Sequence, residues 1–196
     1  MEQKEVRVLL EQVAGGKLDI DEAMLKLKEA PFEDLGFAKP DYHRALRQGI
    51  AEVIYGAGKT PEQIHDIVAS MVQQGQKSIL ITRMSSEAAE AVEQDFILKY
   101  DKYSRLGLVG EIPEPDGIGK VVVAAAGTSD LPVAEEAAQT AECFGNEVVR
   151  LYDVGVAGLH RLLAHREEIM TARVIVAVAG MEGALASVIG GLADCP

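Results

Sequence analysis

Residues 121–137 read VVVAAAGTSDLPVAEEA, and this stretch decides the fold. An unbroken run of Val and Ala is typical of a strand buried on both faces, because such a strand cannot alternate apolar with polar residues. The run ends in the Gly-Thr-Ser-Asp tetrapeptide 127–130, and Pro132 suits the first turn of a following helix. We interpret the turn as a phosphate-binding loop, since the N–H groups and dipole of a helix N-terminus favour an anion.

The same alternation of apolar strands with helices continues to the end of the sequence. Continuous apolar strands separated by helices call for a parallel sheet that is covered on both faces. We therefore expect an α/β fold, a three-layer, doubly wound parallel sheet, over residues 116–196. The last residues, 193–196, resemble a turn into a further strand, so we expect this unit to be incomplete at its C-terminus. The expected strands are 120–127, 147–155 and 173–180, and the expected helices are 130–145, 158–172 and 181–193.

Residues 1–115 are expected to form a separate N-terminal module. It begins with a helical hairpin whose second helix is capped by Asp19 or Asp21, and a short helix capped by Asp41 follows. A small βαβα unit comes next, before a polar joint rich in Gly and Pro at 101–120. The strands of this unit are expected at 51–56 and 78–83, and its helices at 60–75 and 85–96.

Composition restricts the class of protein. The 196 residues are 48% hydrophobic and 26% charged, which is ordinary for a globular chain. A formal net charge of -12 argues against a nucleic-acid-binding surface, which needs a density of Lys and Arg. The two cysteines lack zinc-site spacing and fit a reducing compartment, and neither a signal peptide nor a membrane span is recognisable, so we expect a cytoplasmic protein.

Three glycine-containing loops follow the C-terminal strands, where ligands bind in open parallel sheets. In the first, Ser129 or Asp130 could simply cap a helix, but its place after a buried strand favours a binding role. The second, 153–158, puts Asp153 between small residues, and an ordinary surface turn is the alternative. The third, 179–183, puts Glu182 at the start of an apolar helix, where an ordinary first-turn charge is equally reasonable.

Other motifs carry less chemistry. Residues 56–60, GAGKT, resemble the end of a P-loop, but Val53 stands where the motif needs Gly, so we do not expect ATP binding there. Lys59 can still supply a positive charge near a helix N-terminus. His160 and His165 are five residues apart and do not share a helix face, and Cys143 fits the core better than a nucleophilic site.

Four segments carry a resemblance to known families. The loops resemble those of phosphoribosylaminoimidazole carboxylase (PurE), and the match to the LarB family, pyridinium-3,5-biscarboxylic acid mononucleotide synthases, is closer and covers nearly the whole chain. The matching segments are DLGFAKPDYHRALRQGIAEVIYGAGKT (34–60), AGTSDLPVAEEAAQTAE (126–142), RLYDVGVAGLHRLLAH (150–165) and VAGMEGALASVIGGL (178–192).

The sequence departs from PurE at both of that family's histidines. Its Ser-Ala-His-Arg loop corresponds here to residues 155–158, Gly-Val-Ala-Gly, and its second histidine falls on Ala184. Glu182 stands where PurE has a small residue. This replacement suits a carboxylase with different acid and base requirements.

The resemblance to LarB implies that nicotinic acid adenine dinucleotide is carboxylated at pyridine C5 with carbon dioxide and that its phosphoanhydride is hydrolysed to release AMP. In this family a cysteine thiolate adds to the cationic ring and makes it electron-rich enough to attack carbon dioxide. That cysteine belongs to a segment beyond Pro196, and neither Cys143 nor Cys195 matches its context. We therefore expect no carboxylation by the 196-residue chain alone.

The resulting hypothesis assigns a role to each candidate residue. Glu182 is the candidate general base or ring-positioning residue. The other candidates bind the substrate: Gly127 permits its close approach, Thr128, Ser129 and Asp130 hold its phosphate or ribose, Asp153, Gly155 and Gly180 line the crevice, and Arg44 and Lys59 balance phosphate charge.

We expect no tightly bound cofactor and no metal site, although Mg²⁺ could accompany the substrate pyrophosphate. The resemblance implies a homo-oligomer, an octamer, with no nucleic-acid or membrane partner. One alternative is a carboxylase or mutase acting on an aminoimidazole ribonucleotide, against which the absent histidines count. Another is a non-catalytic nucleotide-binding or assembly subunit.

Overall fold

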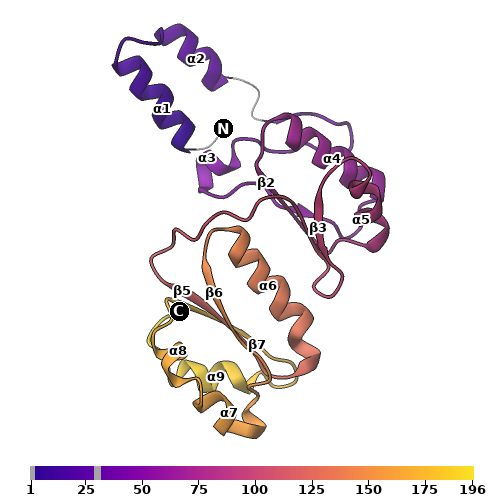
Figure 1. Cartoon of the computed structure of the whole chain (residues 1–196), viewed down its shortest axis with the longest axis vertical. Coiled ribbons are helices and arrows are strands. Elements are labelled where there is room, and N and C mark those ends of the chain that lie inside the picture. Colours follow the sequence, from indigo (N-terminus) through magenta and orange to yellow (C-terminus); the bar gives the residue numbers. More distant parts are fainter. Residues whose placement is uncertain (1–2, 29–31) are drawn as a thin grey trace.

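The chain consists of a helical hairpin, a four-stranded sheet and a three-stranded sheet, in that order (Figure 1). The structure is a computed structural model that describes residues 3–28 and 32–196. Within these residues no helix is both long and apolar enough to cross a membrane.

The expected N-terminal helical hairpin is confirmed. Helices α1 (Gln3–Ala14) and α2 (Ile20–Lys28) pack against each other, and each has a buried apolar residue, Leu9 on α1 and Ala23 on α2. The Asp19 carboxylate accepts a hydrogen bond from the backbone N–H of Asp21, so Asp19 is the residue that caps α2.

The four-stranded sheet is mixed, with strand order β1-β2-β4-β3. β1 (Ile54–Tyr55) runs parallel to β2 (Ser78–Thr82), whereas β4 (Leu106–Gly110) is antiparallel to both β2 and β3 (Leu98–Asp101). The prediction that 101–120 is a polar joint was therefore wrong for its first half. The two glycines of β4, Gly107 and Gly110, made this strand hard to recognise in the sequence. At Gly107 a Cβ would lie 2.5 Å from the Met84 sulfur, so a glycine permits the close packing of Met84.

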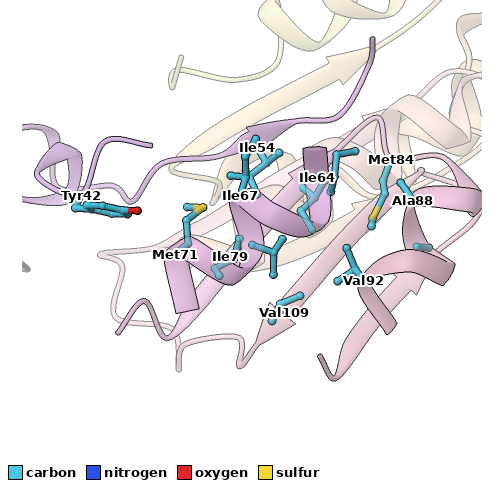
Figure 2. Packing of buried hydrophobic residues seen from close by; sticks show 13 residues of the cluster. Tyr42, Ile54, Ile64, Ile67, Met71, Ile79, Met84, Ala88, Val92 and Val109 are labelled. Atoms are coloured by element: carbon cyan, nitrogen blue, oxygen red, sulfur yellow. The ribbon is translucent and has the colours of Figure 1, made fainter. Parts of the chain in front are cut away.

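Helices α4 (Pro61–Gln73) and α5 (Ser86–Glu93) cover one face of this sheet. Figure 2 shows the resulting core, in which Ile64, Ile67 and Met71 of α4 point towards Ile79 and Val109 of the sheet. Thr60 begins α4 with a reciprocal pair of hydrogen bonds to Gln63, and Ser85 caps α5.

The short helix α3 (Arg44–Gln48) follows His43, and the expectation that Asp41 caps it was wrong. The Asp41 carboxylate instead accepts from the His43 N–H in a local turn, and the Asp41 backbone forms a bridge to Phe32. A carboxylate two residues before an N–H can satisfy it in a turn as well as at a helix start, so sequence alone does not separate the two outcomes.

The three-stranded sheet is parallel, with order β6-β5-β7, and helices cover both faces, which confirms the expected α/β class. Alternate β5 residues face opposite layers: Val123 and Ala125 pack towards α6, and Val122 and Ala124 towards the helices of the other face. Figure 1 shows α6 on one side of this sheet and α7, α8 and α9 on the other. The strands are β5 (Lys120–Ala125), β6 (Glu147–Leu151) and β7 (Val174–Val178), and the helices are α6 (Leu131–Cys143), α7 (Leu159–Leu163), α8 (Arg166–Met170) and α9 (Ala184–Gly190).

The single helix expected over 158–172 is instead the pair α7 and α8. Leu162 and Ile169 are the residues that these two helices bury against the sheet. A spacing of seven is compatible with one helix or with two short ones, so periodicity could not resolve the break.

Helix α6 lies between the two sheets. Ala134 and Ala138 pack on β5, whereas Cys143 belongs to a cluster with Leu80 and Leu108 of the other sheet. The expected domain boundary at 115/116 falls in the exposed segment 111–119, but because α6 packs on both sheets, independent folding of two domains stays a prediction. After α9 the chain returns to the three-stranded sheet, where the Ile175 N–H donates to the Pro196 carbonyl.

His65 links α4 to the segment that follows α5. Its Nε2 lies 2.8 Å from Oδ2 of Asp95, and its ring packs against Phe96. The hydrogen bond to Asp95 raises the pKa of His65 above the ordinary value of 6.5, although burial opposes this shift. The charged imidazole therefore contributes stability below pH 6.5, and this contribution is lost as the pH rises through the folded-state pKa.

We expect Asp95→Asn to lower the free energy of unfolding by about 0.5 kcal/mol near pH 5 and by much less near pH 9, because Asp95 is solvent-exposed and pairs with a charge only at low pH. Urea denaturation at both pH values measures the difference. Glu93→Gln, an exposed change on α5, is the matched control. An equal loss at both pH values would contradict the ion pair.

Candidate functional site

The loops that follow β5, β6 and β7 meet at the carboxyl edge of the parallel sheet. The Ala126 N–H donates to the Val178 carbonyl at 2.9 Å, and the Val154 N–H donates to the Ala125 carbonyl at 3.0 Å. Gly155 approaches so closely that a Cβ there would lie 2.7 Å from the Ala126 oxygen. The sequence-predicted loops are thus neighbours in space.

The first loop is organised by Asp130. Residues Thr128–Asp130 form one turn of 3₁₀ helix before α6, and the Asp130 N–H donates to the Gly127 carbonyl. The Asp130 carboxylate turns back and accepts from the Gly127 N–H at 3.0 Å, so Asp130, one of the two candidate caps, stands at the N-cap position of α6 but its side chain makes no capping hydrogen bond to that helix. Thr128 and Ser129 are both exposed at this edge.

Asp130 also joins the first loop to the third. A Cβ on Gly180 would lie 3.5 Å from Asp130 Oδ1, which is ordinary contact distance. A carboxylate in this position repels a phosphate placed beside it and attracts hydroxyl donors. Of the two ligand groups left open for residues 128–130, a ribose hydroxyl therefore suits Asp130 better than a phosphate does.

The second loop brings a cation that sequence reasoning missed. Asp153 has a left-handed backbone (φ 58°), and its carboxylate forms an ion pair with Arg161 from the first turns of α7. Gly158 makes room for this arrangement, because a Cβ there would lie 2.7 Å from Nε of Arg161. Asp153 and Arg161 are eight residues apart in the sequence, and no local motif predicts an ion pair at that spacing.

The third loop presents Glu182 in a tight turn. The Gly183 N–H donates to the Gly180 carbonyl at 3.0 Å, and the helix begins only at Ala184, so the expectation that Glu182 lies within the helix was wrong. Met181 is fully exposed and adopts a left-handed φ of 51°. Such a backbone is strained for a residue with a side chain, and strain of this kind gathers at functional sites. The Glu182 side chain is exposed.

Arg44 and Lys59 are not brought to these loops by any contact among the residues that the structure describes. Lys59 Nζ donates to the Tyr55 carbonyl at the end of β1, at 2.7 Å. Helix α3, which begins with Arg44, lies near the helical hairpin and away from the lower part of Figure 1, where the parallel sheet is found. Their role in balancing phosphate charge stays a prediction.

Cys143 is confirmed as a core residue. It is buried between α6 and the four-stranded sheet, and burial raises the pKa of its thiol to about 11. A thiol with such a pKa is almost entirely protonated at neutral pH and is a poor nucleophile. Cys195 is half-buried and packs against the core beneath α9.

A charged network fastens α6 to β6. The Arg150 guanidinium binds both Glu135 and Glu142, and the Tyr152 hydroxyl donates to Glu135 at 2.8 Å. Burial and the neighbouring Glu135 carboxylate raise the pKa of Tyr152, so it stays neutral. The network holds the helix that carries the first loop.

Two hollows lie along α6, and neither includes a residue of the three loops. One, of about 440 Å³, lies between α6 and the β3–β4 hairpin, and the other, of about 500 Å³, lies beside Arg83 and Phe144. Over the described part of the chain, no group of three or more His, Cys, Asp or Glu residues could hold a metal ion. Binding of Mg²⁺ together with the substrate pyrophosphate therefore stays a prediction.

Comparisons with known proteins agree with this architecture. The family model described as LarB/PurE-like N-terminal domain matches residues 32–111, which end at β4. The uncharacterized protein MJ0165 of Methanocaldococcus jannaschii is 35% identical over 202 residues, covering 98% of this chain and 79% of the archaeal protein. The chain therefore belongs to the same family as this archaeal protein, and its residues 32–111 are similar to the LarB/PurE-like N-terminal domain.

Proposed function

We propose that this chain binds nicotinic acid adenine dinucleotide at the edge formed by its three loops and serves its carboxylation at pyridine C5, with release of AMP. The convergence of hydroxyl, carboxylate and guanidinium groups from residues 127–130, 153–161 and 180–183 carries the proposal. The match of residues 32–111 to the LarB/PurE-like N-terminal domain supports the carboxylase class.

In this proposal the first loop recognises the ribose and its phosphate. The Asp130 carboxylate, already fixed by the Gly127 N–H, accepts a hydrogen bond from a ribose hydroxyl. The exposed Thr128 and Ser129 hydroxyls donate to the phosphate, and Arg161, paired with Asp153, supplies a guanidinium on the second loop. The bond of Asp130 to Gly127 holds its carboxylate in place before the substrate arrives.

The carboxylation step forms a carbon–carbon bond between C5 and carbon dioxide and requires removal of the C5 proton. A thiolate that has added to the ring supplies electron density for the attack and then leaves with its own electron pair, so no oxidant is needed. We assign this thiolate to neither Cys143 nor Cys195, because Cys143 is a buried neutral thiol and Cys195 packs against the core. Glu182, exposed in its turn, is the proposed base for the C5 proton.

Hydrolysis of the phosphoanhydride adds water across the bond between the two phosphates and gives AMP and the dicarboxylated mononucleotide. The chain has a net charge of -12, so it offers no general attraction for this anionic substrate. Binding in the proposal therefore depends on the local donors at the loops.

We expect the chain to bind nicotinic acid adenine dinucleotide and Ser129→Ala to weaken this binding about tenfold, because a hydrogen bond to a charged phosphate is lost. Isothermal titration calorimetry measures both affinities without requiring turnover. Ser187→Ala, an exposed serine change on α9, is the matched control and should bind as the wild type does. Aminoimidazole ribonucleotide is titrated in parallel, and binding of that nucleotide alone would contradict the proposal in favour of the purine-type alternative.

Glu182→Gln should lower the rate of product formation about a hundredfold or more, because the variant loses the general base. The dissociation constant of the dinucleotide should change less than about twofold, because a general base acts on the reaction and not on binding. The measurement uses mass spectrometry with ¹³C-bicarbonate, on the chain fused at Pro196 to the cysteine-bearing segment implied by the resemblance to LarB. Unchanged product formation by the variant would remove Glu182 from the mechanism. Turnover by the unfused chain would contradict the assignment of the thiolate outside its two cysteines.

A further inference from the structure

One face of α6, together with the loop before it, docks on the four-stranded sheet through three polar contacts. Tyr103 Oη donates to the Thr128 carbonyl at 3.4 Å, and Arg83 Nε binds Glu136 at 3.1 Å. Gln139 Nε2 donates to the Asp101 carboxylate at 2.7 Å. Glu136, Gln139 and Cys143 are spaced three and four residues apart, so they share one face of α6, and Cys143 belongs to an apolar cluster with Leu80.

Hydrogen bonds to the Asp101 carboxylate define the turn between β3 and β4 that carries Tyr103. The Asp101 carboxylate accepts from the Tyr103 N–H at 2.9 Å and from the Ser104 hydroxyl at 2.8 Å, in addition to Gln139. Burial would raise the pKa of Asp101, but these donors outweigh it and lower the pKa, so the carboxylate is charged at neutral pH. Ser104 is buried, and Arg105 completes the turn with a left-handed φ of 59°.

The contact made by Tyr103 falls on a structurally critical atom of the first loop. The Thr128 carbonyl also accepts from the Leu131 N–H, the bond that closes the 3₁₀ turn. The same turn carries the exposed Ser129 hydroxyl and the Asp130 carboxylate. Holding this carbonyl from the neighbouring sheet therefore fixes the orientation of the side chains assigned above to the nucleotide.

We propose that Tyr103 is a positioning residue of the nucleotide site, and that its hydroxyl, supplied by the N-terminal module, holds the Thr128–Asp130 turn in its binding conformation. This inference rests on the proposed function and extends it, because it gives the N-terminal module a direct part in nucleotide binding. Tyr103 acts through Thr128 and needs no contact with the substrate.

Tyr103→Phe removes the hydroxyl and keeps the ring, which is half exposed. We expect about threefold faster amide hydrogen exchange in the peptide covering residues 126–131, and a dissociation constant for nicotinic acid adenine dinucleotide raised about threefold, the effect of one neutral hydrogen bond. The melting temperature should change by less than about 2 °C, because an exposed bond contributes little to global stability. Gln139→Leu removes the hydrogen bond from α6 to Asp101 in the β3–β4 turn that carries Tyr103. This variant should also speed exchange and weaken dinucleotide binding.

Tyr55→Phe is the matched control, since Tyr55 is also an exposed tyrosine of the four-stranded sheet, and it should change neither exchange nor affinity. Wild-type exchange or wild-type affinity in Tyr103→Phe would overturn the proposal. So would weakened binding in Tyr103→Ala alone, which would indicate that the ring touches the substrate. If the wild-type chain binds no dinucleotide, the proposed function fails, and the exchange measurement then decides by itself whether Tyr103 holds the turn.

Discussion

The packing of α6 between two sheets is the constraint on which the rest of the structure depends. The helix needs small residues where it lies against β5, and Ala134 and Ala138 are fully buried there. It needs an apolar residue at its far end against the other sheet, and Cys143 fills that place. Because both contacts fix the helix, they also fix the loop that begins it.

This constraint explains the composition of β5. A strand with α6 on one face and α7, α8 and α9 on the other has no solvent face, so all its residues after Lys120 are Val and Ala without alternation. The polar groups gather where the strand ends, and there Gly155 permits the second loop to approach the Ala126 backbone. Close approach of the loops leaves Asp130 beside Gly180, where an added Cβ would lie 3.5 Å from its carboxylate, although fifty residues separate the two.

The sequence was sufficient for features that depend on local pattern. The parallel α/β unit, the helical hairpin and the helix expected from residue 60 all follow from hydrophobic spacing and short-range signals, although the sequence left the cap of the second helix open between Asp19 and Asp21. β4 was missed because its buried residues are interrupted by glycine, and the break between α7 and α8 was missed because the spacing of seven is ambiguous. In both cases the local sequence pattern carries no information about the tertiary contacts that determine the element.

The side chains that complete the candidate site were beyond sequence reasoning for a different reason. The pairing of Asp153 with Arg161 and the contact of Tyr103 with Thr128 are set by how loops and sheets dock, and no short-range motif encodes them.

The same docking also determines the electrostatics around the loops, because Arg83 and Arg161 are each paired with a carboxylate of the chain itself. An anionic nucleotide would therefore meet cations whose charge is already balanced, so its recognition must come from oriented hydroxyl and amide donors more than from net charge. Orientation of the Thr128–Asp130 turn is then the quantity that the fold has to control: Ala126, just before the turn, is bonded to β7, and Tyr103 binds the turn from the neighbouring sheet.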